Sequence, residues 1–353
     1  MPKRLKPTRV RLGSDFAGLD SGAFALQLLG LPFERTFACD AAAHSLKVLS
    51  YGGAQHIFTD ITQRALERTP AVDLYLFGPP CQPFSTSGQR EGLNAADGCL
   101  ALHSLAYILH HRPSMIVMEQ VPNVLKVADD MMTLIFSELR TAGYSLSSKL
   151  IRSDAYGVPQ MRERLYLVGV RFPVSEFRFP DEVPCPPVAS FIDPLPAGRF
   201  QVLPEGASQL RARNVEEQIE KRVNSGVNPL ERAVFVASGA SSSRCHSTVD
   251  VCMTITRTEA ARLGYWCSLK GGFLEARELG RLQGFPDDLI PWKDLEISES
   301  QFGALVGNAM SLNVLMHLLP CVLRSGGFIT EDACRSCLQA AVRFHPVQCP
   351  RPS

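Results

Sequence analysis

The chain has 353 residues, of which 45% are hydrophobic and 20% are charged, and its formal net charge is +1. A chain of this length and composition can bury a sizeable core, which excludes a disordered, fibrous or strongly basic protein. Because the net charge is almost zero, any surface that binds nucleic acid must be local.

Eleven cysteines are scattered through the chain without the spacing of a disulfide framework. The polar start of the sequence lacks the apolar segment of a signal peptide. We therefore expect reduced thiols in an intracellular compartment, either a nucleus or a bacterial cytoplasm. No stretch reaches the roughly 18 apolar residues of a membrane helix, so we expect a soluble protein. The basic start, Lys3–Arg11, is either a solubilising tail or an arm that contacts phosphates.

Short apolar runs alternate with amphipathic stretches from Val10 to Arg171, which is typical of βαβ units and predicts a doubly wound, Rossmann-like α/β sheet. The expected strands are Val10–Ser14, Arg35–Cys39, Gln55–Phe58, Val72–Phe77, Met115–Met118, Ser145–Arg152 and Arg164–Val170. The expected helices between them are Ala23–Leu29, Ala42–Ser50, Cys99–His111 and Asp130–Thr141.

The sequence pattern changes after Arg171, where frequent prolines interrupt both the helical and the strand periodicity of apolar residues. We expect a catalytic domain at 8–171, a smaller loop-rich domain at 172–270, helices returning to the first domain at 271–325, and a tail without pattern at 326–353. The helices expected in these parts are Val215–Arg222, Leu274–Gln283 and Ser300–Leu319.

The segment Gly78–Ser85 reads GPPCQPFS and directly follows the apolar run Val72–Phe77. Open α/β sheets bind their ligands at the carboxyl ends of strands, and three prolines restrict the backbone of this loop. Cys81 is therefore a candidate nucleophile. The alternative is a buried structural thiol.

A second group of residues indicates a nucleoside site. The segment Asp15–Gly22, DFAGLDSG, occupies the turn from the first strand to the first helix, where glycines allow close approach of a ligand. Asp40 and Asp60 follow the next two strands, where carboxylates can accept hydrogen bonds from ribose hydroxyls and an adenine amino group. The alternative for the glycines is an ordinary strand-to-helix turn.

Charged residues also follow or precede apolar runs further along the chain. Glu119 ends the run that starts at Met115, on the strand expected next to the Cys81 strand. Arg162 and Arg164 lie in the segment QMRER and share one face if that segment is extended. The alternatives are a solvated strand-end carboxylate and a pair of surface arginines.

These motifs, in this order, resemble those of the cytosine-5 DNA methyltransferases, and together they span 16–314. The resemblance implies transfer of a methyl group from S-adenosylmethionine to carbon 5 of a flipped cytosine in DNA, through a covalent Cys81 adduct. It also matches Arg281–Pro286, RLQGFP, to a helix that supports the recognition domain, and Gly307–Ser311 to the start of the last helix.

The resemblance carries over a set of site residues. The residues around the cofactor would be Phe16, Ala17, Gly18, Leu19, Asp40, Asp60, Ile61, Pro80 and Asn308. The catalytic residues would be Cys81 as nucleophile, Glu119 holding a proton at the ring nitrogen, Arg164 at the cytosine carbonyl oxygen, and Arg162 as support near Glu119.

The sequence departs from the family pattern at three places. Asp20 and Ser21 stand where bacterial members usually have glycines, so the turn has another composition. Gln120 replaces the Asn that braces the nucleophile loop in the family, and the arginine usually found near Asp97 is missing.

The expected partner is double-stranded DNA, read by basic residues of 172–270 while the loop Ser85–Asp97 closes over the base, and we expect a monomer. One alternative is a tRNA cytosine-5 methyltransferase of the same fold. Another is a weakly active module that uses this fold to hold DNA. A zinc site is weakly indicated by Cys334, Cys337, His345 and Cys349, and we expect no metal.

Overall fold

The structure is a computed structural model that describes residues 9–80, 100–193, 208–239, 241 and 245–347. The chain folds into two compact units. The first unit comprises Met1–Ile151, Glu163–Asp181 and Val314–Arg343, and the second comprises Arg152–Arg162, Glu182–Asn313 and Phe344–Ser353. Each unit is therefore built from separate stretches of sequence.

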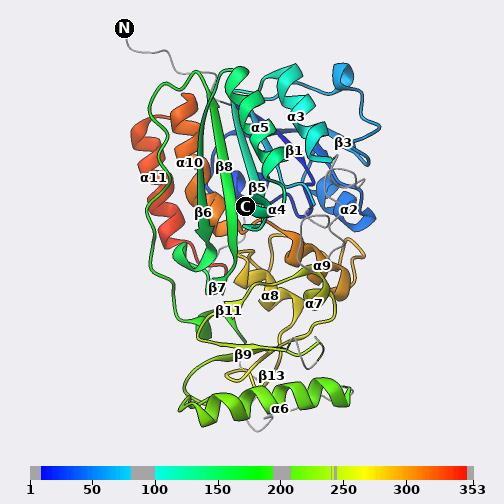
Figure 1. Ribbon diagram of the computed structural model, residues 1–353, viewed down its shortest axis with the longest axis vertical. Helices are drawn as coiled ribbons and strands as arrows, with labels where there is room; N and C mark the ends of the chain where they lie inside the picture. The colour runs from blue at the N-terminus through cyan, green and yellow to red at the C-terminus, as the bar shows by residue number, and fades with distance from the viewer. Residues whose placement is uncertain (1–8, 81–99, 194–207, 240, 242–244, 348–353) are drawn as a thin grey trace. The chain divides into compact units, whose positions relative to one another are not determined.

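A seven-stranded sheet forms the centre of the first unit (Figure 1). Its strands are β1 (Val10–Asp15), β2 (Phe33–Cys39), β3 (His56–Phe58), β4 (Leu74–Phe77), β5 (Met115–Gln120), β6 (Tyr144–Arg152) and β8 (Glu163–Arg171). Their order in space is β3-β2-β1-β4-β5-β8-β6. The pairs from β3 to β5 are parallel, whereas β8 runs antiparallel to β5. The order reverses between β1 and β4, and open α/β sheets bind their ligands at the carboxyl ends of strands at such a point.

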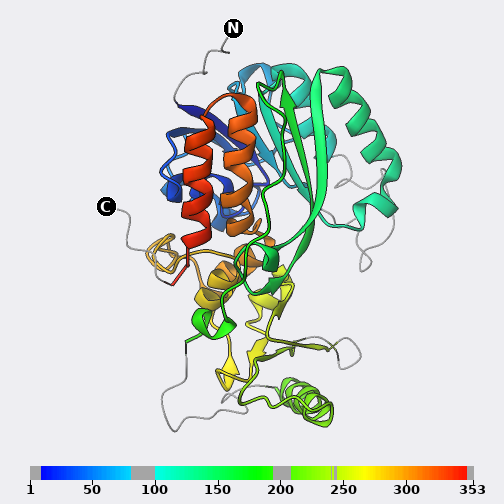
Figure 2. The ribbon, with the colours of Figure 1, turned by 90° about the vertical axis from the view of Figure 1, so that its left-hand side faces the viewer.

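Helices cover both faces of this sheet, with α3 and α5 on one face and α10 and α11 on the other (Figure 2). The helices of this unit are α1 (Ser21–Leu28), α2 (Ala43–Tyr51), α3 (Leu100–His111), α4 (Val124–Val127), α5 (Asp129–Thr141), α10 (Leu312–Gly326) and α11 (Glu331–Arg343). Because both faces are covered, β4 and the first four residues of β5, Met115–Met118, are buried and apolar at every position and not only at alternate ones.

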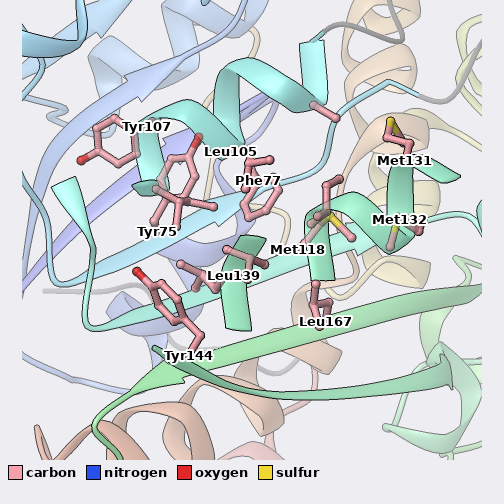
Figure 3. Packing of buried hydrophobic residues seen from close by; sticks show 14 of the residues in the cluster. Tyr75, Phe77, Leu105, Tyr107, Met118, Met131, Met132, Leu139, Tyr144 and Leu167 are labelled. Carbon is pink, nitrogen blue, oxygen red and sulfur yellow. The ribbon is translucent and has the colours of Figure 1, made fainter. Parts of the chain in front are cut away.

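The core on the α3 and α5 side is rich in aromatic rings (Figure 3). Ile116 and Met118 of β5 point into this core. Met115, one residue away, faces the other side, where it contacts Gly326 at the end of α10. The alternation of side chains along the strand therefore distributes β5 between the two layers of helices.

The second unit contains a small antiparallel sheet with the order β10-β9-β12-β13 and a separate two-stranded pairing of β7 with β11. Its strands are β7 (Gln160–Met161), β9 (Val234–Ala237), β10 (Ser247–Val249), β11 (Cys252–Met253), β12 (Tyr265–Cys267) and β13 (Gly272–Phe273). Its helices are α6 (Gln209–Asn224), α7 (Arg257–Ala261), α8 (Ala276–Leu282) and α9 (Glu299–Asn308). Val215 of α6 packs on Val234, Val236 and Trp266 of the sheet.

The doubly wound sheet predicted from the sequence is confirmed, and each of its expected strands exists with ends displaced by at most two residues. The expectation that 172–270 holds one helix among loops is wrong, because the described residues of this part contain four strands and a second α-helix. These strands are two to four residues long, which is too short to produce a readable alternation.

Three further expectations near the C-terminus are corrected. The stretch expected as one helix over Ser300–Leu319 is interrupted, because Ala309 adopts an extended backbone conformation after α9. Asn308 consequently ends α9 and does not open the last helix. The expected tail contains α11, whose buried face is made of the small residues Cys334, Cys337 and Ala341, a weak hydrophobic signal in the sequence.

Within the described residues, no single helix has the length and apolar composition needed to cross a membrane; the bent pair of α9 and α10 passes that test only when both helices are counted together.

Candidate active site

The turn after β1 brings the first predicted cofactor residues together. Phe16 and Gly18 both have φ near +55°, a conformation that glycine adopts freely and other residues rarely. The Ala17 amide donates to the Cys39 carbonyl oxygen at 3.0 Å, and the Gly18 amide donates to Asp40 Oδ2 at 2.8 Å. Asp40, directly after β2, therefore lies beside the turn as the sequence predicted.

Asp20 explains how this turn forms without the usual glycines. It has φ 54° and ψ 47° at the N-terminal cap of α1, and Asp tolerates this left-handed conformation better than most residues. Ser14 Oγ donates to its carboxylate at 3.1 Å. Burial raises the pKa of Asp20, and the charge of Arg35 partly opposes that effect. The Asp20 carboxylate thus ties the turn to Ser14 at the end of β1.

The other wall of the expected cofactor site follows β3. The backbone amide and the hydroxyl of Thr62 donate to Asp60 Oδ1 at 2.8 and 2.7 Å, and these hydrogen bonds lower the pKa of Asp60. Ile61 is buried, whereas Asp60 faces solvent. The chemistry fits a nucleoside, with carboxylates for its hydroxyl and amino donors. Open space also lies over Gly18, since no described atom comes within 4 Å of the point where a side chain would begin.

A buried ion pair that was not expected from the sequence lies below these two walls. Arg64 donates to both carboxylate oxygens of Asp15, at 2.5 and 2.7 Å, and the Tyr75 hydroxyl donates to the same carboxylate. Burial alone would lower the pKa of Arg64, but the hydrogen bonds and charge of Asp15 raise it, so the guanidinium stays charged. Asp15 and Arg64 are 49 residues apart, and no local pattern connects them.

Glu119 and Arg164 face each other across two neighbouring strands of the same sheet. Glu119 lies on β5, which pairs with β4 in parallel and with β8 in antiparallel register. Arg164 Nε is 3.2 Å from Glu119 Oε1, and the two side chains are only 15% and 12% exposed. A carboxyl group and a guanidinium are therefore held together at the end of β5 that lies beside the loop after β4.

Gln120 holds the beginning of that loop. Its Nε2 donates to the Pro79 carbonyl oxygen at 2.9 Å, and its Oε1 accepts from the Val121 amide at 3.1 Å. Pro79 is buried and Pro80 is half-buried. Cys81, the predicted nucleophile, lies outside the described residues, as do Ser85 and Asp97 of the expected closing loop.

Arg162 and Asn308 belong to the second unit. The guanidinium of Arg162 is buried and donates from Nη1 to the Ile255 and Gly307 carbonyl oxygens, at 3.1 and 3.2 Å. Arg162 thus connects the backbones before α7 and near the end of α9, and the arginine that pairs with Glu119 is Arg164.

The glutamine of the same motif binds the predicted supporting helix. Gln160 Nε2 donates to the Leu282 carbonyl oxygen and to Gln283 Oε1, both at 2.9 Å. Gln283 in turn donates to the Val306 and Ala309 carbonyl oxygens. Gln160 of QMRER and Gln283 of RLQGFP therefore belong to one hydrogen-bonded network inside the second unit.

The cysteines considered for zinc show no metal arrangement within the described part of the chain. Cys334 and Cys337 are both buried on α11, and Cys349 lies outside the described residues. No group of three or more His, Cys, Asp or Glu side chains among the described residues could hold a metal ion.

The doubly wound fold of the first unit is one that solved methyltransferase structures share. The chain resembles the solved structure of the Dnmt2 methyltransferase of S. pombe, with a TM-score of 0.62 and 17% identity over 90% of this chain and 99% of that one. It also resembles the methyltransferase EhMeth of Entamoeba histolytica, with a TM-score of 0.64 and 15% identity over 90% and 98% of the two chains.

The family follows from the sequence match. The model of the C-5 cytosine-specific DNA methylases matches residues 10–322, so the chain belongs to that family and is a DNA cytosine-5 methyltransferase. The Type II methyltransferase M.HhaI of Haemophilus parahaemolyticus is 26% identical over 322 residues, covering 88% of this chain and 93% of the relative. Enzymes of this family take the methyl group from S-adenosylmethionine.

Proposed function

We propose that the chain methylates carbon 5 of a flipped cytosine through a covalent bond between Cys81 and carbon 6. Addition of the thiolate makes carbon 5 electron-rich, and loss of the carbon 5 proton and of the thiolate after methylation restores the ring. Glu119 would hold the proton at ring nitrogen 3, and Arg164 would stabilise negative charge at the cytosine carbonyl oxygen. S-adenosylmethionine would supply the methyl group.

The cofactor would lie on the turn Phe16–Leu19, between Asp40 and the pair Asp60 and Ile61, with Pro80 as a further contact. Asp40 is already bound to the Gly18 amide, so it would hold the turn as well as accept from ribose. Asp60 would accept from the adenine amino group, and its lowered pKa keeps it a carboxylate well below neutral pH. Asn308 is the remaining residue that the family pattern assigns to the cofactor.

The substrate would be double-stranded DNA, bound by a monomer. The target carbon is inaccessible inside the base stack, so the cytosine must leave the helix before it reaches Cys81. Basic residues of 172–270 would bind phosphates and guanine edges on either side of it.

The observation that best supports this proposal is the partly buried pair of Glu119 and Arg164 beside the loop that Gln120 braces. A carboxyl group that shares a sheltered site with one guanidinium can exchange a proton with a ring nitrogen while the arginine binds an adjacent oxygen. Both groups lie at the carboxyl end of β5, next to the strand that leads to Cys81.

The test is transfer of a radiolabelled methyl group from S-adenosylmethionine to unmethylated duplex DNA and, in parallel, to a tRNA pool. Cys81→Ala should abolish transfer to DNA. Cys185→Ala is the matched control, because burial raises the pKa of the Cys185 thiol to about 12 and makes it a poor nucleophile. DNA containing 5-fluorocytosine should trap the wild-type protein covalently and leave Cys81→Ala free.

Labelled DNA with unlabelled tRNA would support the proposal. Label in tRNA alone would contradict the choice of substrate, and transfer that survives in Cys81→Ala would contradict the covalent mechanism. Binding of DNA without any transfer would favour the weakly active binding module.

A further inference from the structure

Arg64 occupies an unusual environment for a charged residue. Its side chain is 1% exposed and that of Asp15 is fully buried. The guanidinium carbon lies 5.0 Å from the ring centre of Phe37, 5.4 Å from that of Phe58 and 5.3 Å from that of Tyr107. Three aromatic rings and one bidentate carboxylate thus surround a single positive charge.

Such a pair is a poor way to increase stability. Removing two charges from water costs about as much as their attraction returns, and apolar residues of similar size often stabilise a core equally well. What an ion pair adds is geometry, because a planar guanidinium bound through two hydrogen bonds fixes both distance and orientation. The role of Arg64 and Asp15 is therefore to fix the positions of the two chain segments that carry them.

The two residues join the opposite walls of the cofactor site. Asp15 is the last residue of β1 and directly precedes the turn that begins at Phe16. Arg64 follows Asp60 by four positions, in a turn closed by a hydrogen bond from the Gln63 amide to the Asp60 carbonyl oxygen. A displacement of Arg64 would carry the Asp60 turn away from the end of β1.

We propose that the Arg64–Asp15 ion pair, held by the Tyr75 hydroxyl, is a positioning device that sets the spacing between the Phe16–Gly18 turn and Asp60 for binding S-adenosylmethionine. The inference rests on the proposed cofactor site. Arg64, Asp15 and Tyr75 do not contact the cofactor in this proposal. They act on cofactor affinity through the positions of the turn and Asp60, and they leave DNA affinity unchanged.

The first test replaces both charges with apolar residues, in Asp15→Leu/Arg64→Met. Removing only one partner would leave a buried charge without compensation, and that variant can simply fail to fold. The double variant should melt within a few degrees of wild type, yet bind S-adenosylmethionine about 10- to 100-fold more weakly, the usual effect of small displacements in a site. Isothermal calorimetry with S-adenosylmethionine and thermal melting measure the two quantities.

The second test removes one hydroxyl and keeps the ring. Tyr75 and Tyr107 lie next to each other in the core, with ring centres 4.7 Å apart (Figure 3). The Tyr75 hydroxyl donates to Asp15, whereas the Tyr107 hydroxyl donates to the Pro70 carbonyl oxygen at 2.7 Å. Tyr75→Phe should raise the KM for S-adenosylmethionine about three- to tenfold, the loss expected for one hydrogen bond, with kcat and the KM for DNA unchanged. Tyr107→Phe, the matched control, should leave all three constants unchanged.

Steady-state kinetics at saturating DNA and at saturating cofactor separate the outcomes. An Asp15→Leu/Arg64→Met protein that binds the cofactor with wild-type affinity would overturn the inference, as would equal effects of Tyr75→Phe and Tyr107→Phe. If the wild-type protein itself binds no S-adenosylmethionine, the proposed cofactor site fails, and the inference fails with it.

Discussion

The side-chain amide of Gln120 donates to the Pro79 carbonyl oxygen at 2.9 Å, which joins the end of β5 to the loop that leads from β4 to Cys81. Gln120 is 2% exposed and Pro79 is buried, so this hydrogen bond forms away from solvent. The longer side chain therefore performs the bracing that the family pattern gives to an asparagine.

We expect Gln120→Ala to lower kcat by about 10- to 100-fold, because the proline loop would lose the bond that orients it. Gln120→Asn should also lower kcat, since the shorter side chain cannot keep both Pro79 and its own position on the strand. Single-turnover methylation of duplex DNA measures the effect, with the exposed Gln55→Ala as control. Wild-type rates in both Gln120 variants would show that the bond does not orient the nucleophile.

Glu119→Gln should lower kcat by about 10²- to 10⁴-fold, the usual contribution of a positioned acid or base. The amide keeps the size of the side chain but cannot exchange a proton with the cytosine ring. Glu163→Gln is the control on the neighbouring strand, because Arg164 donates to the backbone carbonyl oxygen of Glu163, which this substitution retains. Binding of S-adenosylmethionine should be unchanged in both variants. A normal rate in Glu119→Gln would remove Glu119 from the mechanism.

The cofactor turn gives a separate prediction. Gly18→Ala should lower stability by roughly 1–2 kcal/mol, because its φ of +55° is unfavourable for alanine. It should raise the KM for S-adenosylmethionine at least about tenfold, because the added methyl would occupy the open space above the turn. Asp60→Asn should also raise this KM without changing stability.

Asp73→Asn is the control for Asp60→Asn. Asp73 precedes β4 and pairs with Arg11, at the opposite edge of the sheet from the cofactor turn. Calorimetric titration and melting curves provide the two readouts. Equal cofactor affinity in Gly18→Ala and wild type would contradict the assignment of the turn.

His345 gives a prediction for pH dependence. Burial lowers the pKa of His345, and the charge of Arg281 lowers it further. The ring packs on Phe191 with centres 4.5 Å apart, and its Nδ1 accepts from the Val347 amide, an arrangement of the neutral form. The unfolded chain thus takes up this proton at higher pH than the folded one, so stability is fully present above about pH 6.5 and falls as the pH drops through the folded pKa.

We therefore expect the stabilising effect of His345 relative to His345→Gln to shrink between pH 8 and pH 5, by about 1–2 °C in melting temperature. A melting-temperature difference that stays constant over this range would rule out the titration of His345 as its cause.

The sequence predicts those site residues whose positions follow from the residues directly before them in the chain. Asp40 and Asp60 follow apolar runs directly, and Glu119 ends one, so the order of residues alone places each of them at a strand end. The same logic placed the Glu119 strand beside the strand that leads to Cys81, which the structure confirms.

The parts of the site and the fold that the sequence does not predict depend on contacts between residues far apart in the chain. Nothing near Arg64 indicates that it pairs with Asp15, and the antiparallel direction of β8, which brings Arg164 to Glu119, depends on how the chain returns to the sheet. The strands of the second unit were missed because each is too short for reliable alternation.

The division of the first unit into separate stretches has a consequence for the order of its folding. The chain leaves the ribosome from its N-terminus, so all seven strands of the large sheet emerge before α10 and α11. Met115 on β5 packs against Gly326, more than two hundred residues later in synthesis. The part of the sheet that α10 covers therefore waits for the last part of translation. We expect nascent chains of this enzyme to bind chaperones and C-terminal truncation to cause aggregation.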